Sequence, residues 1–169
     1  MVDFERERIL PYSPAQVWAV LADFENHKIW NPYTRIQALQ EDPVLLRYEL
    51  RMDPHKPKFV EVPAILLAAY PERLLTIDVR PNFLLKFEES YALTPTEGGT
   101  KLHHSYSVRG FLVGLRLPGV RTSFERMLES IDGILLSWLD RKYKGSAPKA
   151  VPPSKPIPRP KPKYRGGRR

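Results

Sequence analysis

Residues 13–32 read SPAQVWAVLADFENHKIWNP, and this stretch decides the fold. Ser13 is a suitable N-cap, and Pro14 suits the first helical position, where its missing N–H costs nothing. Apolar residues then recur at helical spacing, at Val17, Trp18, Leu21 and Phe24. The Asn31–Pro32 pair ends the helical stretch, because proline disfavours the helical conformation of the residue before it. The segment predicts two short helices separated by a break.

Strand-like stretches lie on both sides of this helical segment. They span residues 3–10, 44–52, 58–69, 73–80, 85–94 and 100–109. Pro63 argues that its strand lies at an edge of the sheet or contains a bulge. The Glu97-Gly98-Gly99 run predicts a hairpin turn. Strands that follow one another in a block cannot be joined by parallel crossovers, so we expect one antiparallel sheet of about seven strands.

The last periodic segment before Gly145 predicts a long amphipathic helix. Its apolar residues recur at steps of four and three, at Phe124, Leu128, Ile131, Leu135 and Trp138. One apolar face of the sheet needs cover, and this helix is the only element large enough to provide it. The expected fold is therefore α+β, with a curved antiparallel sheet wrapped on the C-terminal helix and two short helices between the first two strands. A helix gripped in this way leaves a cavity, which suggests a small apolar ligand.

Charge is distributed unevenly along the 169 residues. The chain has 27 basic and 19 acidic residues, a formal net charge of +8. Residues 146–169 hold eight of the basic residues and no acidic one, so the remaining 19 basic residues balance the 19 acidic ones. This segment is also rich in proline, which excludes helix and sheet. We expect a ligand-binding domain over residues 1–145 and a disordered basic tail over residues 146–169.

The basic tail favours polyanionic partners. An anionic membrane surface would attract it, and nucleic acid would bind it without sequence specificity. A solubilising extension is an equal alternative. The chain has no cysteine, and its four histidines lack metal-ligand spacing, so we expect neither a metal site nor a cofactor. The N-terminus is not a signal peptide, which favours a cytoplasmic location. Nothing in the sequence predicts the oligomeric state.

Several segments resemble the helix-grip, START-like SRPBCC superfamily, and within it the polyketide cyclase/dehydrase-like group. They are residues 13–23 with Trp30-Asn31-Pro32, Tyr70-Pro71 before Leu74-Leu75, residues 91–95 leading into residues 98–102, and the closing helix with Leu128 and Ile131. The resemblance covers about residues 2–144. It implies a cavity between the curved sheet and the C-terminal helix. Superfamily members bind lipids, polyketides, sterols or plant hormones, and some catalyse cyclisation or dehydration.

Alternation places a set of side chains on the interior face of the sheet or helix. The candidate ligand contacts are Tyr48, Leu50, Phe87, Glu89, Tyr91, His104, Tyr106, Leu128, Ile131, Leu135 and Trp138. The tyrosines would donate hydrogen bonds to a ligand oxygen, although they also fill space as good strand formers. Trp138 would either line the cavity or pack beside it.

Two functions follow from the same cavity. The first is binding or carriage of a small hydrophobic molecule such as a lipid, an isoprenoid or a polyketide. The alternative is a cyclase or dehydratase with His104 as base and Glu89 or a tyrosine as acid. Against that, His104 suits a hydrogen-bonded core histidine, and Glu89 suits a rim or cross-strand position. A third reading makes the basic tail the functional part, tethering the protein to a polyanion or a membrane surface. Convergence of the polar groups on one point favours chemistry, whereas dispersal favours carriage.

Overall fold

The computed structural model describes residues 1–51, 53–82, 85–110 and 118–144. In chain order the elements are β1 (Val2–Leu10), α1 (Pro14–Leu21), the 3-10 helix η1 (Phe24–Asn26), α2 (His27–Trp30), β2 (Thr34–Ala38), β3 (Leu45–Leu50), β4 (Val60–Tyr70), β5 (Leu74–Asn82), β6 (Leu85–Thr96), β7 (Gly99–Arg109) and α4 (Pro118–Tyr143). This order confirms the α+β helix-grip fold predicted from the sequence.

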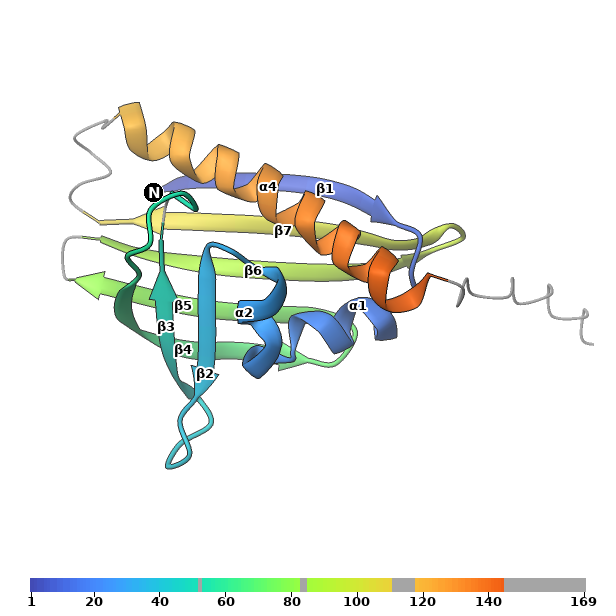
Figure 1. Cartoon of the computed structure of the whole chain (residues 1–169), viewed down its shortest axis with the longest axis horizontal. Coiled ribbons are helices and arrows are strands. Elements are labelled where there is room, and N and C mark those ends of the chain that lie inside the picture. The colour runs from blue at the N-terminus through green and yellow to red at the C-terminus, as the bar shows by residue number, and fades with distance from the viewer. Residues whose placement is uncertain (52, 83–84, 111–117, 145–169) are drawn as a thin grey trace, which may run out of the picture.

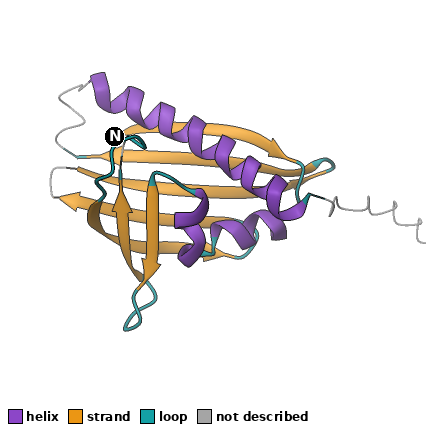
Figure 2. Cartoon of the chain, viewed as in Figure 1, coloured by secondary structure: helices purple, strands orange, loops and turns teal. Residues whose placement is uncertain are grey.

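The seven strands form one antiparallel sheet in the order β1-β7-β6-β5-β4-β3-β2. The sheet curls so strongly that β2 and β3 run across the direction of the other strands in the view of Figure 1. Helix α4 lies diagonally over the concave face, and α1 and α2 lie beside its C-terminal half (Figures 1 and 2). Two layers, one sheet and one set of helices, therefore enclose the core.

The helical segment begins as its sequence predicts. The Ser13 hydroxyl accepts a hydrogen bond from the Gln16 backbone N–H at 3.3 Å, and Gln16 Oε1 accepts one from the Ser13 N–H at 3.0 Å. These reciprocal bonds form a capping box, which satisfies amide groups that the first helical turn leaves free. Val17 and Leu21 face the core, so the short helix is held by packing as well as by its cap.

Two strands differ from the expectation. β2 was not predicted, although Thr34 and Ile36 are buried and Arg35 and Gln37 point outward in the alternation typical of a strand. β2 has only five residues, and so short an alternation cannot be distinguished from a loop in the sequence. β4 lies between β3 and β5 and is not an edge strand, and its bulge falls between Leu66 and Ala68 rather than at Pro63. The strand expected over residues 44–52 spans Leu45–Leu50 in the structure, and Met52 lies outside the described residues.

Helix α4 buries the apolar stripe that its sequence predicts. The residues that face the sheet are Phe124, Met127, Leu128, Ile131, Leu135 and Leu139. Trp138 is only partly buried, because the stripe continues to Leu139 and leaves the indole at its margin. The helix therefore covers the sheet along its length, and Trp138 packs beside the core.

Substitution of Gly99 by alanine is expected to lower the free energy of unfolding by about 2 kcal/mol. The cost arises from backbone strain at positive φ together with a steric clash of the new Cβ. Gly99 has φ +131°, and a Cβ there would collide with the Leu10 carbonyl oxygen. Gly98, next to it in the β6–β7 turn, has open space around it and provides the matched control. Urea denaturation measures both variants. Equal stability of Gly99→Ala and Gly98→Ala would contradict the prediction.

The predicted tail, residues 146–169, lies outside the described residues. No helix in the described part of the chain is both long enough and apolar enough to span a membrane.

Candidate functional site

A buried carboxylate lies at the centre of the concave face. Glu89 Oε1 accepts hydrogen bonds from the hydroxyls of Tyr91 and Tyr106, each at 2.6 Å. Glu89 Oε2 accepts a third from the Tyr48 hydroxyl at 2.7 Å. All four side chains are at most 1 % exposed. Three phenol donors thus satisfy one carboxylate inside the core.

Strand parity and sheet curvature together bring these side chains to one place. In the β6–β7 ladder Glu89 pairs with Tyr106 and Tyr91 pairs with His104, so all four point to the same face. Tyr48 comes from β3, three strands away from β6 in the sheet order. In a flat sheet those strands would be roughly 14 Å apart. The curl of the sheet therefore allows the Tyr48 hydroxyl to reach Glu89.

His104 connects this carboxylate to helix α4. Its Nδ1 lies 2.8 Å from Asp132 Oδ1, and its Nε2 lies 3.6 Å from Glu89 Oε1. The second distance is too long for a hydrogen bond, so it is a charge contact. Asp132 Oδ2 lies 4.0 Å from Arg6 Nε on β1. We call Tyr48, Glu89, Tyr91, His104, Tyr106 and Asp132 the Glu89 cluster.

The contacts within the cluster lower the pKa of its carboxylate and raise the pKa of its imidazole. Burial by itself would raise the pKa of Glu89, but His104 and the tyrosine donors outweigh burial and lower the pKa from 4.5 to about 2. Burial by itself would lower the pKa of His104, but Asp132 and Glu89 raise it above 6.5. Burial raises the pKa of all three tyrosines well above 10, so they remain hydrogen-bond donors.

Some buried polar atoms have no hydrogen-bond partner. They include His104 Nε2 and Asp132 Oδ2 in the cluster, and, outside it, Trp30 Nε1 and Asn31 Nδ2 at the end of α2. An unpaired buried polar group is costly, so such atoms mark places that suit a water or a ligand oxygen.

A second buried histidine, His27 on α2, also lacks one partner. Its Nε2–H donates to the Leu21 carbonyl at 2.9 Å, which leaves Nδ1 unpaired. Burial lowers the pKa of His27 and keeps the ring neutral, although the Glu89 charge acts in the opposite direction.

Aromatic rings fill the space between the cluster and the N-terminal half of α4. The Phe124 ring on α4 stacks on Phe4 with centroids 5.5 Å apart, and contacts Phe87 and Tyr106 at 5.6 and 5.3 Å. The Tyr91 ring stacks on His104 at 4.1 Å. This packing means that a guest on the concave face has to displace side chains or α4.

The predicted ligand contacts fall into two groups. Most are buried on the concave face or under α4: Tyr48, Phe87, Glu89, Tyr91, His104, Tyr106, Leu128, Ile131 and Leu135. Leu50 and Trp138 are only partly buried. Among the predicted contacts, Leu128 lines an open pocket of about 570 Å³ between β1 and α4. Trp138 lines another, of about 230 Å³, between α2 and α4.

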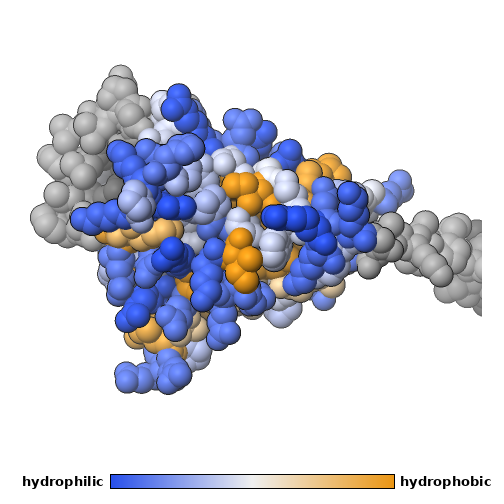
Figure 3. Space-filling view, viewed as in Figure 1, coloured by the Kyte–Doolittle hydropathy of each residue, from blue (hydrophilic) through white to orange (hydrophobic). Residues whose placement is uncertain are grey.

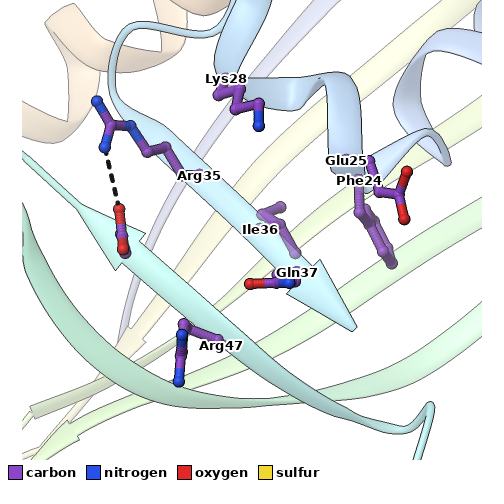
Figure 4. A pocket seen from close by; sticks show the side chains of 8 residues that line it. Phe24, Glu25, Lys28, Arg35, Ile36, Gln37 and Arg47 are labelled. Atoms are coloured by element: carbon purple, nitrogen blue, oxygen red, sulfur yellow. Dashed lines mark hydrogen bonds and ion pairs between the residues drawn. The ribbon is translucent and has the colours of Figure 1, made fainter. Parts of the chain in front are cut away.

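A third open pocket, of about 350 Å³, lies between η1, α2, β2 and β3 (Figure 4). It is charged rather than apolar, with Lys28, Arg35 and Arg47 in its lining. Arg35 Nη1 bonds Glu49 Oε2 at 3.4 Å, as the dashed line shows. None of the predicted ligand contacts lines this pocket.

Sequence reasoning missed one member of the cluster. Asp132 is fully buried on α4, between Leu128 and Leu135 on the apolar stripe. An acidic residue at a stripe position is a signal, because a buried carboxylate requires a partner. The histidine that pairs with it lies on another element, and nothing in the sequence joins the two. Among the described residues, no group of three His, Asp or Glu side chains is placed to hold a metal ion.

Several solved structures have a fold similar to this one. The fold is similar to TTHA0849 of Thermus thermophilus, with TM-score 0.66 and 15 % identity over 83 % of this chain and 99 % of that chain. A START superfamily protein of Mycobacterium smegmatis has TM-score 0.65 and 16 % identity over 83 % and 97 % of the two chains. The di-domain ARO/CYC StfQ of the steffimycin biosynthetic pathway has TM-score 0.65 and 16 % identity over 86 % and 51 %. No curated protein matches.

The fold is therefore similar to that of START-like structures. Residues 1–132 match the family described as polyketide cyclase / dehydrase and lipid transport, and the chain belongs to that family. The resemblance stated from the sequence is confirmed.

Proposed function

We propose that this protein binds and carries a small hydrophobic molecule with a hydrogen-bond-accepting oxygen, such as a lipid, an isoprenoid or a polyketide. The bound molecule would lie between the concave face and α4. One observation carries the proposal: His104 Nε2 is buried in the interior and lacks a hydrogen-bond partner. A ligand carbonyl or hydroxyl near Nε2 would supply the missing acceptor. Family membership supports the same function class.

The side chains around His104 suit this role. The rest of the concave face is aromatic and aliphatic, as expected of a pocket in which a few polar groups fix the orientation of an apolar ligand. Because aromatic rings occupy the space under α4, binding requires α4 to shift away from the sheet. Membership of a family described as polyketide cyclase / dehydrase and lipid transport supports binding of such a molecule.

A cyclase or dehydratase is the second candidate, and convergence of the Glu89 cluster favours it. Its six polar groups are joined by direct contacts through Glu89 and His104, which is the arrangement expected for chemistry. The pKa directions argue against the roles expected from the sequence. The raised pKa of His104 disfavours a role as a base, and Glu89 with a pKa of about 2 is not an acid near neutral pH. A catalytic role would need His104 as the proton donor.

Native mass spectrometry of freshly purified full-length protein tests the proposal. We expect an adduct of a small organic molecule that is lost on denaturation. His104→Gln is expected to weaken binding of the probe 1-anilinonaphthalene-8-sulfonate about tenfold, as the loss of one buried hydrogen bond to a charged donor implies. His103→Gln is the matched control, because His103 is the neighbouring residue and points to the opposite, exposed face. No adduct, together with equal probe binding by both variants, would contradict the proposal.

The same variants separate carriage from catalysis. A dehydratase would convert a linear poly-β-keto thioester to a product that has lost one water, which mass spectrometry detects. A carrier leaves the thioester unchanged and binds it. Turnover that His104→Gln abolishes and His103→Gln retains would favour the enzyme.

Three further expectations stay predictions: the cytoplasmic location, the domain boundary at residue 145, and the attraction of residues 146–169 to an anionic membrane or to nucleic acid. The basic composition of those residues supports the last.

A further inference from the structure

One face of the molecule combines exposed apolar and basic side chains. The pocket between α2 and α4 is lined by Val20, Asp23, Asn26, Ile29, Trp30, Trp138 and Lys142, which we call the α2–α4 face. Ile29 is 56 % exposed, and the partly buried Trp138 lies across the pocket from it. In Figure 3, apolar residues gather on and between α4 and α2 in the middle of the view. This apolar surface has no cover in the described part of the chain.

Basic side chains surround that apolar surface. Arg141 places its guanidinium 5.0 Å from the Trp138 ring centroid, and Lys142 belongs to the pocket lining. Asp23 is the acidic residue of the lining, and it accepts a hydrogen bond from Asn26 at 2.8 Å. The last turns of α4 thus bring positive charge to the margin of the apolar surface.

The sequence adds further charge directly after this helix. α4 ends at Tyr143, and residues 146–169 contain eight basic side chains and no acidic one. The rest of the chain has equal numbers of acidic and basic residues. All of the excess positive charge therefore follows the end of α4 that carries Trp138 and Lys142.

We propose that the α2–α4 face docks on an anionic lipid bilayer. Ile29 and Trp138 enter the interfacial layer, while Arg141 and Lys142 contact lipid phosphates. The eight positive charges of residues 146–169 add to the overall attraction to anionic lipid. Amphipathic surfaces bind membranes when apolar burial and attraction to anionic lipids act together, since either one alone gives weak binding. This proposal does not depend on the ligand-binding proposal above, because docking needs no occupied interior.

A bilayer fits this face better than nucleic acid does. Nucleic-acid binding would use the charges but would leave the exposed Ile29 without a role. Proteins that bind single strands stack bases on exposed aromatic side chains. Residues 146–169 contain a single aromatic residue, Tyr164. The pairing of aliphatic exposure with basic charge is what distinguishes a lipid surface.

Vesicle co-sedimentation of the full-length protein tests the docking. Phosphatidylcholine vesicles with added phosphatidylglycerol are expected to bind the protein, and phosphatidylcholine alone is not. Ile29→Asp is expected to lower partitioning about tenfold, in line with the loss of a partly buried isoleucine. Ile9→Asp is the matched control, because Ile9 is 54 % exposed but lies on β1. Lys142→Glu is likewise expected to weaken binding more than Lys58→Glu.

Three results would overturn the proposal: equal sedimentation with neutral and anionic vesicles, unchanged binding of Ile29→Asp, or displacement of the protein from anionic vesicles by polyuridylate at equal phosphate. Circular dichroism verifies that each variant is folded, which the exposure of Ile29 and Lys142 favours. His104→Gln is expected to sediment like the wild type. Failure of the ligand-binding proposal would therefore leave the vesicle result unchanged.

Discussion

Replacement of Glu89 by alanine is expected to lower the free energy of unfolding by about 3–5 kcal/mol, the usual cost of breaking a buried charge network on one side. The variant leaves three buried tyrosine hydroxyls without their acceptor. It also removes one of the two carboxylates that hold the protonated His104. Both losses occur in fully buried positions, where water cannot replace the missing partner.

Glu88→Ala is the matched control for this substitution. Glu88 precedes Glu89 on β6 and, by strand parity, faces the opposite side of the sheet. We expect its effect to stay within about 0.5 kcal/mol, as is usual for surface positions. Guanidinium denaturation followed by circular dichroism measures both. Similar losses in the two variants would mean that the Glu89 cluster contributes nothing special to stability.

The stability of the protein is expected to be greatest between about pH 4.5 and 6.5 and to fall on both sides. On the acidic side, Glu89 has a pKa of about 2 in the folded protein and 4.5 as its ordinary value. The unfolded chain therefore takes up the proton first as the pH falls below 4.5. Stability contributed by Glu89, about 3 kcal/mol for such a difference, is lost as the pH falls through about 2.

On the alkaline side the responsible group is His104. Its pKa is raised above 6.5 in the folded protein, so the unfolded chain releases the proton first as the pH rises. The stabilisation is complete below pH 6.5 and is lost as the pH rises through the folded pKa. Loss of the imidazolium weakens the contacts of β7 with both Asp132 on α4 and Glu89 on β6.

Urea denaturation across the pH range checks this profile. His104→Gln is expected to remove the decrease above pH 6.5 and also to reduce the acidic decrease, because His104 is the first of the contacts that lower the pKa of Glu89. His103→Gln, which changes the exposed neighbour, is expected to keep the wild-type profile. A wild-type stability that stays level from pH 6.5 upward would contradict the assignment of a raised pKa to His104.

Much of the candidate site was predictable from strand parity. Alternation placed Tyr48, Glu89, Tyr91, His104 and Tyr106 on the interior face, and all of them are buried there. Parity is a local property, since successive side chains of any strand point to opposite faces. The same reasoning did not predict β2, because its five residues are too few to show a clear alternation of buried and exposed side chains.

The chemistry of the site was less predictable. The sequence suggested His104 as a base and Glu89 as an acid, whereas their contacts in the structure raise the pKa of His104 and lower the pKa of Glu89. Those states depend on Asp132 and on the three phenols, which come from other positions in the chain. Because pKa values respond to distances of a few ångströms, side-chain parity alone does not determine them.

Short windows of the sequence were enough to predict several features of this protein. These are the order of elements, the capped helix at Ser13, the apolar stripe of α4 and the set of inward-facing side chains. The tertiary structure decided which inward side chains meet. Tyr48 on β3 contacts Glu89 on β6 only because the sheet curls, since β4 and β5 lie between their strands. His104 contacts Asp132 only because α4 packs across the concave face. Curvature and helix docking arise from the summed twist and packing of all strands, and these long-range contacts turn six separate residues into one polar cluster.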